Sequence, residues 1–230
     1  MPKRKRGACA YCGENHKLSV DHVIPRCLFI NGLPSDLPKV GACESCNNQT
    51  KSINDTYLRD MLIMDMDSAE HPIIKELWGK FVRAVQRKQS HAAEDAMRTI
   101  RQINLFTSAG IYAGQAYAFE VQHERTTAIM TMIVRGLYHK YIGGILPDNG
   151  TFDVYRIRDI SKFAPELNIL LQIGARHVRV GDGQVFECIY AHAPDHPGAS
   201  IWFLCFYGKV YFSVATNITS ATDNILKNAS

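Results

Sequence analysis

The stretch that decides how the N-terminal part folds runs from Cys9-Ala-Tyr-Cys12 to Cys43-Glu-Ser-Cys46, with residues 13–42 between the two pairs. Two residues between thiolates let both sulfurs of a pair face one ion, and two such pairs complete a tetrahedral site that is typical of structural zinc. Gly13 follows the first pair, where a tight turn needs a residue without a side chain. All four ligand positions are then filled by protein, so we expect a structural Zn²⁺ ion with no catalytic position open.

Two other interpretations of these four cysteines are weaker. Unrelated core cysteines would not need the paired Cys-x-x-Cys spacing, which is a strong metal signal. A redox-active pair normally lies next to a βαβ pattern, and no such pattern surrounds either pair. The other cysteines, Cys27, Cys188 and Cys205, stand alone among apolar neighbours and are expected to be unreactive core residues.

The composition predicts a globular protein of the cytoplasm. Hydrophobic residues make up 46% of the 230 positions, which is enough for a sizeable core. No apolar run approaches the roughly 20 residues that a membrane span needs, so no membrane association is expected. The basic start, Met-Pro-Lys-Arg-Lys-Arg, is not followed by the apolar stretch of a signal peptide, and an odd number of cysteines argues against a disulfide framework.

Hydrophobic periodicity predicts an α+β fold. The expected helices cover residues 70–88, 92–103 and 126–141. Alternating residues predict strands over 110–120, 152–157, 176–180, 185–192, 199–207 and 210–216. We therefore expect a zinc-stapled module at residues 1–65, followed by an α+β domain at 66–230 with helices at about 70–103 and 126–141 and a mostly antiparallel sheet formed mainly after residue 150.

A polar pair lies on the predicted strand Ser19-Val-Asp-His-Val-Ile-Pro25, between the two cysteine pairs. Pro25 ends the strand, and Asp21 and His22 are adjacent, so they point to opposite faces unless the backbone is bulged. Asn47 directly follows the last cysteine, where the zinc ion would fix its position at the start of a helix. Asn47 is therefore the residue best placed to face the strand that carries His22.

Taken together, Cys-x-x-Cys, Asp-His-x-Ile-Pro and Cys-x-x-Cys-Asn-x-x-x-Lys resemble the zinc-containing HNH endonucleases of the ββα-metal (His-Me finger) superfamily. The similarity is strongest to the variants in which Asn replaces the final His, and it covers residues 9–51, under a quarter of the chain. A weaker similarity to bacterial and phage HNH proteins extends over residues 133–138 and 202–216. The resemblance implies a ββα-metal module in which the zinc ligands are Cys9, Cys12, Cys43 and Cys46.

The resemblance also implies a role for each polar residue. His22 would deprotonate the attacking water, and Asp21 and Asn47 would hold a catalytic Mg²⁺ or Mn²⁺ ion on the scissile phosphate. Asp36 stands where the family usually has an Asn that orients the general base, and an Asp there could accept a hydrogen bond from the imidazole and raise its pKa. The chemistry agrees, because phosphodiester hydrolysis needs an activated water and a hard cation, and such a cation prefers Asp and Asn oxygens to thiolates.

Each of these residues also has a plain structural interpretation. Asp21 could pair with a lysine, His22 could be a satisfied core histidine, and Asn47 could cap a helix. Arg26, after the Ile-Pro turn, and Lys51, one helical turn after Asn47, are expected to contact the nucleic-acid backbone, although ordinary surface charges would fit the same positions.

The leading hypothesis is a metal-dependent endonuclease that acts on DNA, with RNA as a possible substrate. A single site of this kind cuts one strand, so a homodimer is one route to a double-strand break. The net charge of +4 and the basic start are compatible with phosphate contacts. The alternatives are a zinc-finger-like nucleic-acid-binding protein that does not cut, and a nuclease effector gated by its C-terminal domain in a defence system. Arg135, in the helix predicted at 126–141, is expected to have a structural role in the interface between helix and sheet, and the alternative is that it buttresses the N-terminal module or lines a site.

Overall fold

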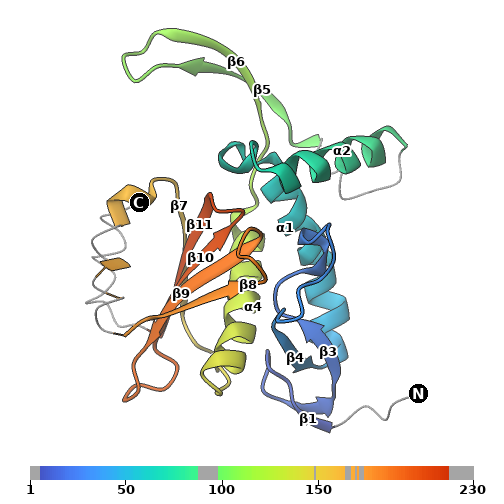
Figure 1. Cartoon of the computed structure of the whole chain (residues 1–230), viewed down its shortest axis with the longest axis vertical. Coiled ribbons are helices and arrows are strands. Elements are labelled where there is room, and N and C mark those ends of the chain that lie inside the picture. Colours follow the sequence, from blue (N-terminus) through green and yellow to red (C-terminus); the bar gives the residue numbers. More distant parts are fainter. Residues whose placement is uncertain are drawn as a thin grey trace.

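The computed structural model describes residues 6–87, 98–147, 149–163, 167–168, 170 and 174–217 and has a mixed α and β architecture (Figure 1). Within these residues the strands form three two-stranded sheets and one five-stranded sheet. Every strand pairing in them is antiparallel. The predicted α+β class is confirmed.

The N-terminal part contains two short hairpins followed by a helix (Figure 1). Its elements are β1 (Arg6–Ala8), β2 (Asn15–Lys17), β3 (Ser19–His22), a 3₁₀ turn (Arg26–Leu28), β4 (Lys39–Ala42), a π-helical turn (Ser45–Lys51) and α1 (Ser52–Met64). β1 pairs with β2 and β3 pairs with β4. Two strands and a helix therefore follow one another in the order that the expected module requires.

The next helix confirms its prediction. After a 3₁₀ turn (Met66–Ser68), α2 spans Pro72–Gln86, within the helix predicted at 70–88. Pro72 fits the first turn because its missing N–H has no helical partner there. The His71 side chain accepts a hydrogen bond from the Ile73 amide at 3.3 Å and so caps the helix start.

The helix predicted over residues 92–103 is wrong at its C-terminal end. Residues 88–97 lie outside the described residues, and from residue 101 the chain forms strand β5 (Arg101–Phe106). β5 pairs with β6 (Tyr112–Ala118), and the positive φ of 78° at Gly110 lets the chain reverse between them. The residues at the start of β5 fit both the alternation of a strand and the spacing of a helix. The hydrogen bonds to β6 favour the strand.

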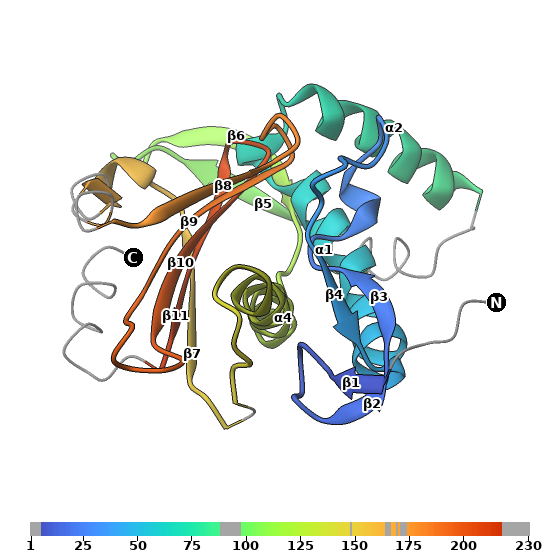
Figure 2. The same cartoon turned by 60° about the horizontal axis from the view of Figure 1, so that its bottom comes forward.

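The second part combines one long helix with a five-stranded sheet. α4 (His123–Tyr141) packs between this sheet and the N-terminal part (Figure 2). The strand order is β7-β11-β10-β9-β8. The strands are β7 (Phe152–Ile157), β8 (Arg176–Val180), β9 (Phe186–His192), β10 (Ser200–Phe206) and β11 (Val210–Thr216), with a 3₁₀ turn (Ile160–Phe163) after β7. The helix predicted at 126–141 and all five strands predicted after residue 150 are confirmed.

The main hydrophobic core runs through both parts of the chain. One cluster of buried residues extends from Cys9 in the first hairpin, through Leu62 of α1 and Ile133 of α4, to Val214 of β11. The predicted division at residue 65 stays a prediction, and the packing across it is continuous. None of the described helices combines the length and the apolar character that crossing a bilayer requires.

Candidate active site and metal centre

The four paired cysteines form a compact cluster that can hold a metal ion such as zinc. The sulfurs of Cys9, Cys12, Cys43 and Cys46 all lie within 4.8 Å of one another. The Cys12 and Cys43 sulfurs are 4.0 Å apart, close to the roughly 3.8 Å expected around a tetrahedral zinc ion with bonds of about 2.3 Å. Among the described residues, no other group of three or more His, Cys, Asp or Glu side chains gathers in this way.

Two turns bring the cysteines together. Between β1 and β2 the Gly13 amide donates to the Cys9 carbonyl at 2.9 Å, and Gly13 has the positive φ of 78° expected of it. After β4 the Cys43 amide donates to the Cys9 sulfur at 3.3 Å, which joins the two pairs. N–H···S bonds of this kind suit a thiolate that binds a metal.

A second site lies where β3 ends beside the helix. His22, Asp21, Asn47 and Arg26 line one open cleft with a volume of about 720 Å³. They come from β3, the following 3₁₀ turn and the π-helical turn. The structure thus brings together four residues that the sequence singled out.

His22 is one of the residues that line this cleft. It is half-buried at the end of β3, and no described group forms a hydrogen bond with its ring. Burial lowers the pKa of His22 from its usual 6.5, and the positive charges of Lys39 and Arg26 lower it further. The ring is therefore neutral at pH 7 and can accept a proton, whereas a core histidine would have its ring nitrogens satisfied.

Asp21 and Asn47 each have one polar atom fixed and one open. Tyr11 donates its hydroxyl hydrogen bond to Asp21 Oδ2, and Asn47 Nδ2 donates to Ser19 Oγ, 3.1 Å away. Neither Asp21 Oδ1 nor Asn47 Oδ1 accepts a hydrogen bond from the described part of the chain; Lys51 Nζ is 3.7 Å from Asp21 Oδ1. These two oxygens are the atoms that could bind a hard cation.

Lys51 corrects one expectation. Its side chain is only 3% exposed, so its ammonium group is not available to a nucleic-acid backbone. Instead it donates to the His22 carbonyl oxygen at 2.7 Å and to both Asp55 carboxylate oxygens at 3.2 Å. Helical spacing correctly predicts that Lys51 lies on the same side of the helix as Asn47. It does not reveal that β3 covers this side and buries the Lys51 side chain. Asp21 does pair with a lysine, as the structural interpretation expected. Lys51 Nζ lies 3.7 Å from Asp21 Oδ1, which is an ion pair but too long for a hydrogen bond.

Asp55, on α1, is a cleft residue that the sequence reasoning missed. It lines the same cleft as His22. Burial raises the pKa of Asp55, and the neighbouring Lys51 ammonium opposes that rise. The sequence does contain a clue to its place: Asn47, Lys51 and Asp55 are spaced four residues apart, which puts them on one face of a helix.

The π-helical turn explains how so many polar residues reach this cleft. Within it the Ser52 amide donates to the carbonyl oxygen of Asn47, five residues earlier, in place of the four-residue step of an α-helix. The wider turn directs Asn47 and Ser52 into the cleft together. Such turns occur frequently at functional sites.

Asp36 does not join this group. Both of its carboxylate oxygens accept hydrogen bonds from the Gly181 amide, at 2.9 and 3.1 Å, and it does not line the cleft. The loop before β4 turns Asp36 towards the turn between β8 and β9. The expected contact with His22 is therefore wrong in this structure, and Asp36 ties the N-terminal part to the sheet.

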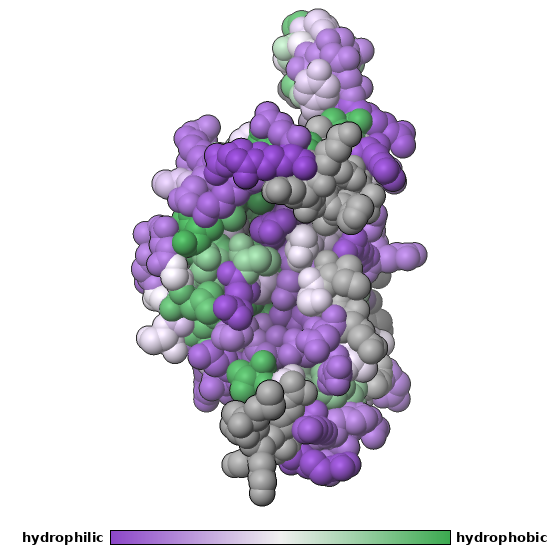
Figure 3. All heavy atoms as spheres, turned by 90° about the vertical axis from the view of Figure 1, so that its right-hand side faces the viewer, coloured by the Kyte–Doolittle hydropathy of each residue, from purple (hydrophilic) through white to green (hydrophobic). Residues whose placement is uncertain are grey.

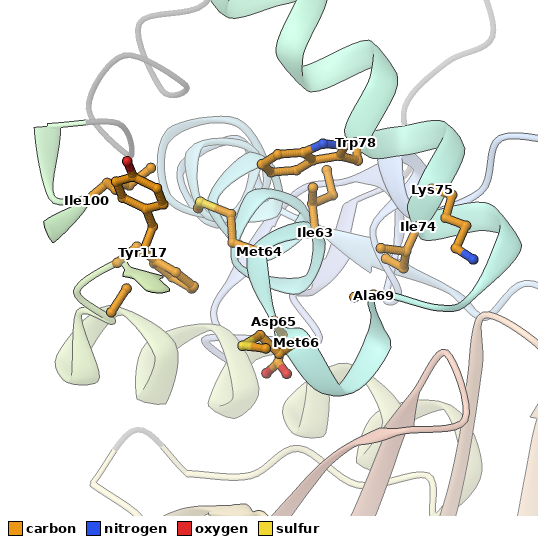
Figure 4. A pocket seen from close by; sticks show the side chains of 12 residues that line it. Ile63, Met64, Asp65, Met66, Ala69, Ile74, Lys75, Trp78, Ile100 and Tyr117 are labelled. Carbon is orange, nitrogen blue, oxygen red and sulfur yellow. The ribbon is translucent and has the colours of Figure 1, made fainter. Parts of the chain in front are cut away.

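A separate cavity of about 280 Å³ at the base of the β5–β6 hairpin has a different character (Figure 4). Trp78, Met64 and Tyr117 dominate its lining. Its two charged residues are already paired, Asp65 with Arg156 at 3.1 Å and Lys75 with Glu70 at 2.6 Å. This apolar cavity lacks the free titratable groups that the β3 cleft provides.

Comparison with known proteins leaves the family open. No family model matches the chain, no curated protein matches it, and no solved structure matches it.

Replacing Lys51 with methionine should destabilise the fold. The change leaves the buried Asp21 and the half-buried Asp55 without their cation, and removing one partner of a buried ion pair costs about 3–5 kcal/mol. The free energy of unfolding of the zinc-loaded protein, measured in urea, tests this. Lys39→Met, which removes an exposed lysine, is the matched control and should change it by under about 0.5 kcal/mol. Equal stability of both variants would contradict the internal role of Lys51.

Proposed function

We propose that this protein is a metal-dependent nuclease that hydrolyses phosphodiester bonds, with DNA as its main substrate. The observation that carries the proposal is the cleft itself: the His22 imidazole, which has no hydrogen-bond partner among the described residues, shares it with the Oδ1 atoms of Asp21 and Asn47. A general base beside hard-cation ligands is the set of groups that this hydrolysis requires. The cysteine cluster supports it by fixing Asn47, which directly follows Cys46.

His22 carries out the proton transfer in this proposal. An imidazole nitrogen removes a proton from a water molecule, whose oxygen attacks phosphorus. The bond between phosphorus and the leaving oxygen then breaks, and that oxygen takes up a proton from water, so the cut strand has one phosphate end and one hydroxyl end. His22 releases the proton it accepted to the solvent. A Mg²⁺ or Mn²⁺ ion on Asp21 and Asn47 would supply positive charge for the phosphoryl oxygens and the leaving oxygen.

The surroundings of the cleft favour an anionic polymer as the ligand. Arg26 is exposed at its edge, and the exposed Lys39 lies opposite His22 in the β3–β4 pairing. The surface on the side of the N-terminal part is mostly hydrophilic (Figure 3). Exposed cations beside an open cleft attract a phosphate backbone.

Cleavage of a supercoiled plasmid by the zinc-loaded protein tests this function. We expect conversion to the nicked form when Mg²⁺ or Mn²⁺ is added and none without it. Single-stranded DNA and RNA of matched length, run in parallel, identify the preferred substrate. Absence of cleavage on every substrate with either metal would contradict the proposal.

A protein that binds nucleic acid without cutting it is the second candidate. The proximity of the Lys51 ammonium to Asp21 Oδ1, 3.7 Å away, favours it, because a nearby cation opposes binding of a second one. Binding in a gel-shift assay, without cleavage at any metal concentration, would support this candidate over the nuclease.

The rate of cleavage should depend on the protonation of His22. A general base works only when neutral, so the rate should rise with pH through the pKa of His22 and level off above it. Because burial and neighbouring cations lower that pKa, the midpoint of the acidic limb should lie below 6.5. Single-turnover nicking rates over the acidic and neutral range measure it. A midpoint above 6.5 would show that His22 does not have this environment, or is not the base.

A further inference from the structure

Tyr11 links the zinc cluster to the cleft. It stands inside the first cysteine pair, between Cys9 and Cys12, and is only 2% exposed. Its hydroxyl donates to Asp21 Oδ2 on β3. The same short turn therefore carries two zinc ligands and the group that holds the carboxylate of the proposed catalytic metal site.

Arg135 of α4 holds the main chain of Tyr11 from the other side. Its Nη1 atom donates to the carbonyl oxygens of Tyr11 at 2.7 Å and Leu146 at 2.8 Å, and its Nη2 atom donates to that of Pro147 at 3.0 Å. Arg135 is 7% exposed, and its guanidinium lies 5.0 Å from the centre of the Phe152 ring. Arg135 thus joins the first cysteine pair to the loop after α4.

Gly136 lets α4 approach this closely. A Cβ atom there would lie 2.7 Å from Val23 Cγ1 and 3.3 Å from Tyr11 Cε1. α4 therefore contacts both Tyr11 and Val23, the residue that directly follows the proposed general base His22. Only a residue without a side chain fits between them.

We propose that Tyr11 is a positioning residue for the catalytic metal site and that α4 supports it through Arg135. This inference rests on the proposed function. The Tyr11 hydroxyl occupies Asp21 Oδ2, so Oδ1, which lies 3.7 Å from Lys51 Nζ, is the carboxylate oxygen without a hydrogen bond from the described residues. In the same way Ser19 occupies the amide nitrogen of Asn47 and leaves its oxygen without such a bond. Each ligand then presents a single, oriented oxygen, which suits Mg²⁺ or Mn²⁺ better than a cation that prefers a bidentate carboxylate. The second part of the chain contributes to the site by holding Tyr11 in place.

Tyr11→Phe removes the hydroxyl and keeps the ring. We expect the Mn²⁺ concentration for half-maximal nicking to rise by about 10–100-fold, the usual effect of losing a group that orients a metal ligand. The matched control is Tyr207→Phe: Tyr207 is 1% exposed, and its hydroxyl donates to the Leu28 carbonyl oxygen at 3.0 Å. Both variants lose a buried hydrogen bond, so both should lose thermal stability, Tyr11→Phe more because its acceptor is a carboxylate, and both should keep their zinc. Only Tyr11→Phe should change the Mn²⁺ requirement; an unchanged requirement in folded Tyr11→Phe would overturn the proposal.

Direct Mn²⁺ binding, followed by electron paramagnetic resonance on the full chain, separates this inference from the nuclease function. Wild type that binds Mn²⁺ without cutting, and Tyr11→Phe that binds it more weakly, would support the positioning role while contradicting the nuclease. Equal Mn²⁺ affinity of the two proteins would overturn the positioning role, whether or not wild type cuts. If Tyr11→Phe does not fold, Arg135→Lys tests the same link, because lysine keeps the charge but cannot reach three carbonyl oxygens. A wild-type Mn²⁺ requirement in Arg135→Lys would then contradict the proposal.

Discussion

Replacing Cys43 with serine should release the bound zinc and unfold the N-terminal part. Its sulfur lies within 4.8 Å of the other three and belongs to a buried residue, so the variant loses one of four ligands and leaves a polar group in the core. Structural zinc sites contribute about 10–16 kcal/mol of apparent binding free energy, which is as large as the whole stability of a typical domain. The effect should therefore be loss of the fold, with no partly active intermediate state.

Metal analysis and thermal unfolding together measure this effect. Wild type should contain about one zinc per chain, and Cys43→Ser should contain almost none and lack a cooperative transition for the N-terminal part. Cys205→Ala is the control, because Cys205 is also buried but lies in β10, outside the cluster. It should keep its zinc and a cooperative transition. A Cys43→Ser protein with full zinc and the wild-type midpoint would contradict the metal site.

Local patterns were sufficient to predict most of the architecture. β7 matches its predicted range because apolar and polar residues alternate along it, and β11 matches because the turn at Gly208-Lys209 fixes where it begins. The cysteine cluster also followed from spacing alone. β5 was mistaken for the end of a helix because its residues fit both periods, and its pairing partner β6 lies beyond the turn.

The sequence predicts only those residues of the candidate site whose positions are fixed by neighbours close to them in the chain. Asp21, His22 and Asn47 stand next to a strand end or a cysteine of the cluster, so their meeting followed from the motif. Burial of Lys51 depends on how β3 covers the helix, which spacing does not reveal. The contact of Arg135 with Tyr11 joins residues 124 positions apart and has no local signal at all.

His22→Ala should abolish most of the cleavage without disturbing the fold. General-base catalysis contributes about 10²–10⁴-fold to a rate, and the remaining activity would come from the metal and from substrate binding. Because no described group bonds to the His22 ring, its removal breaks no protein hydrogen bond. We expect the variant to keep its zinc, its unfolding midpoint and its affinity for nucleic acid.

The measurement that tests the account most directly is the single-turnover nicking rate of wild type and His22→Ala at saturating Mn²⁺, on the same plasmid and with the zinc content of both proteins verified. The account predicts metal-dependent nicking by wild type and a rate at least about 100-fold lower for the variant. Equal rates in the two proteins, or no nicking by the zinc-loaded wild type, would contradict it.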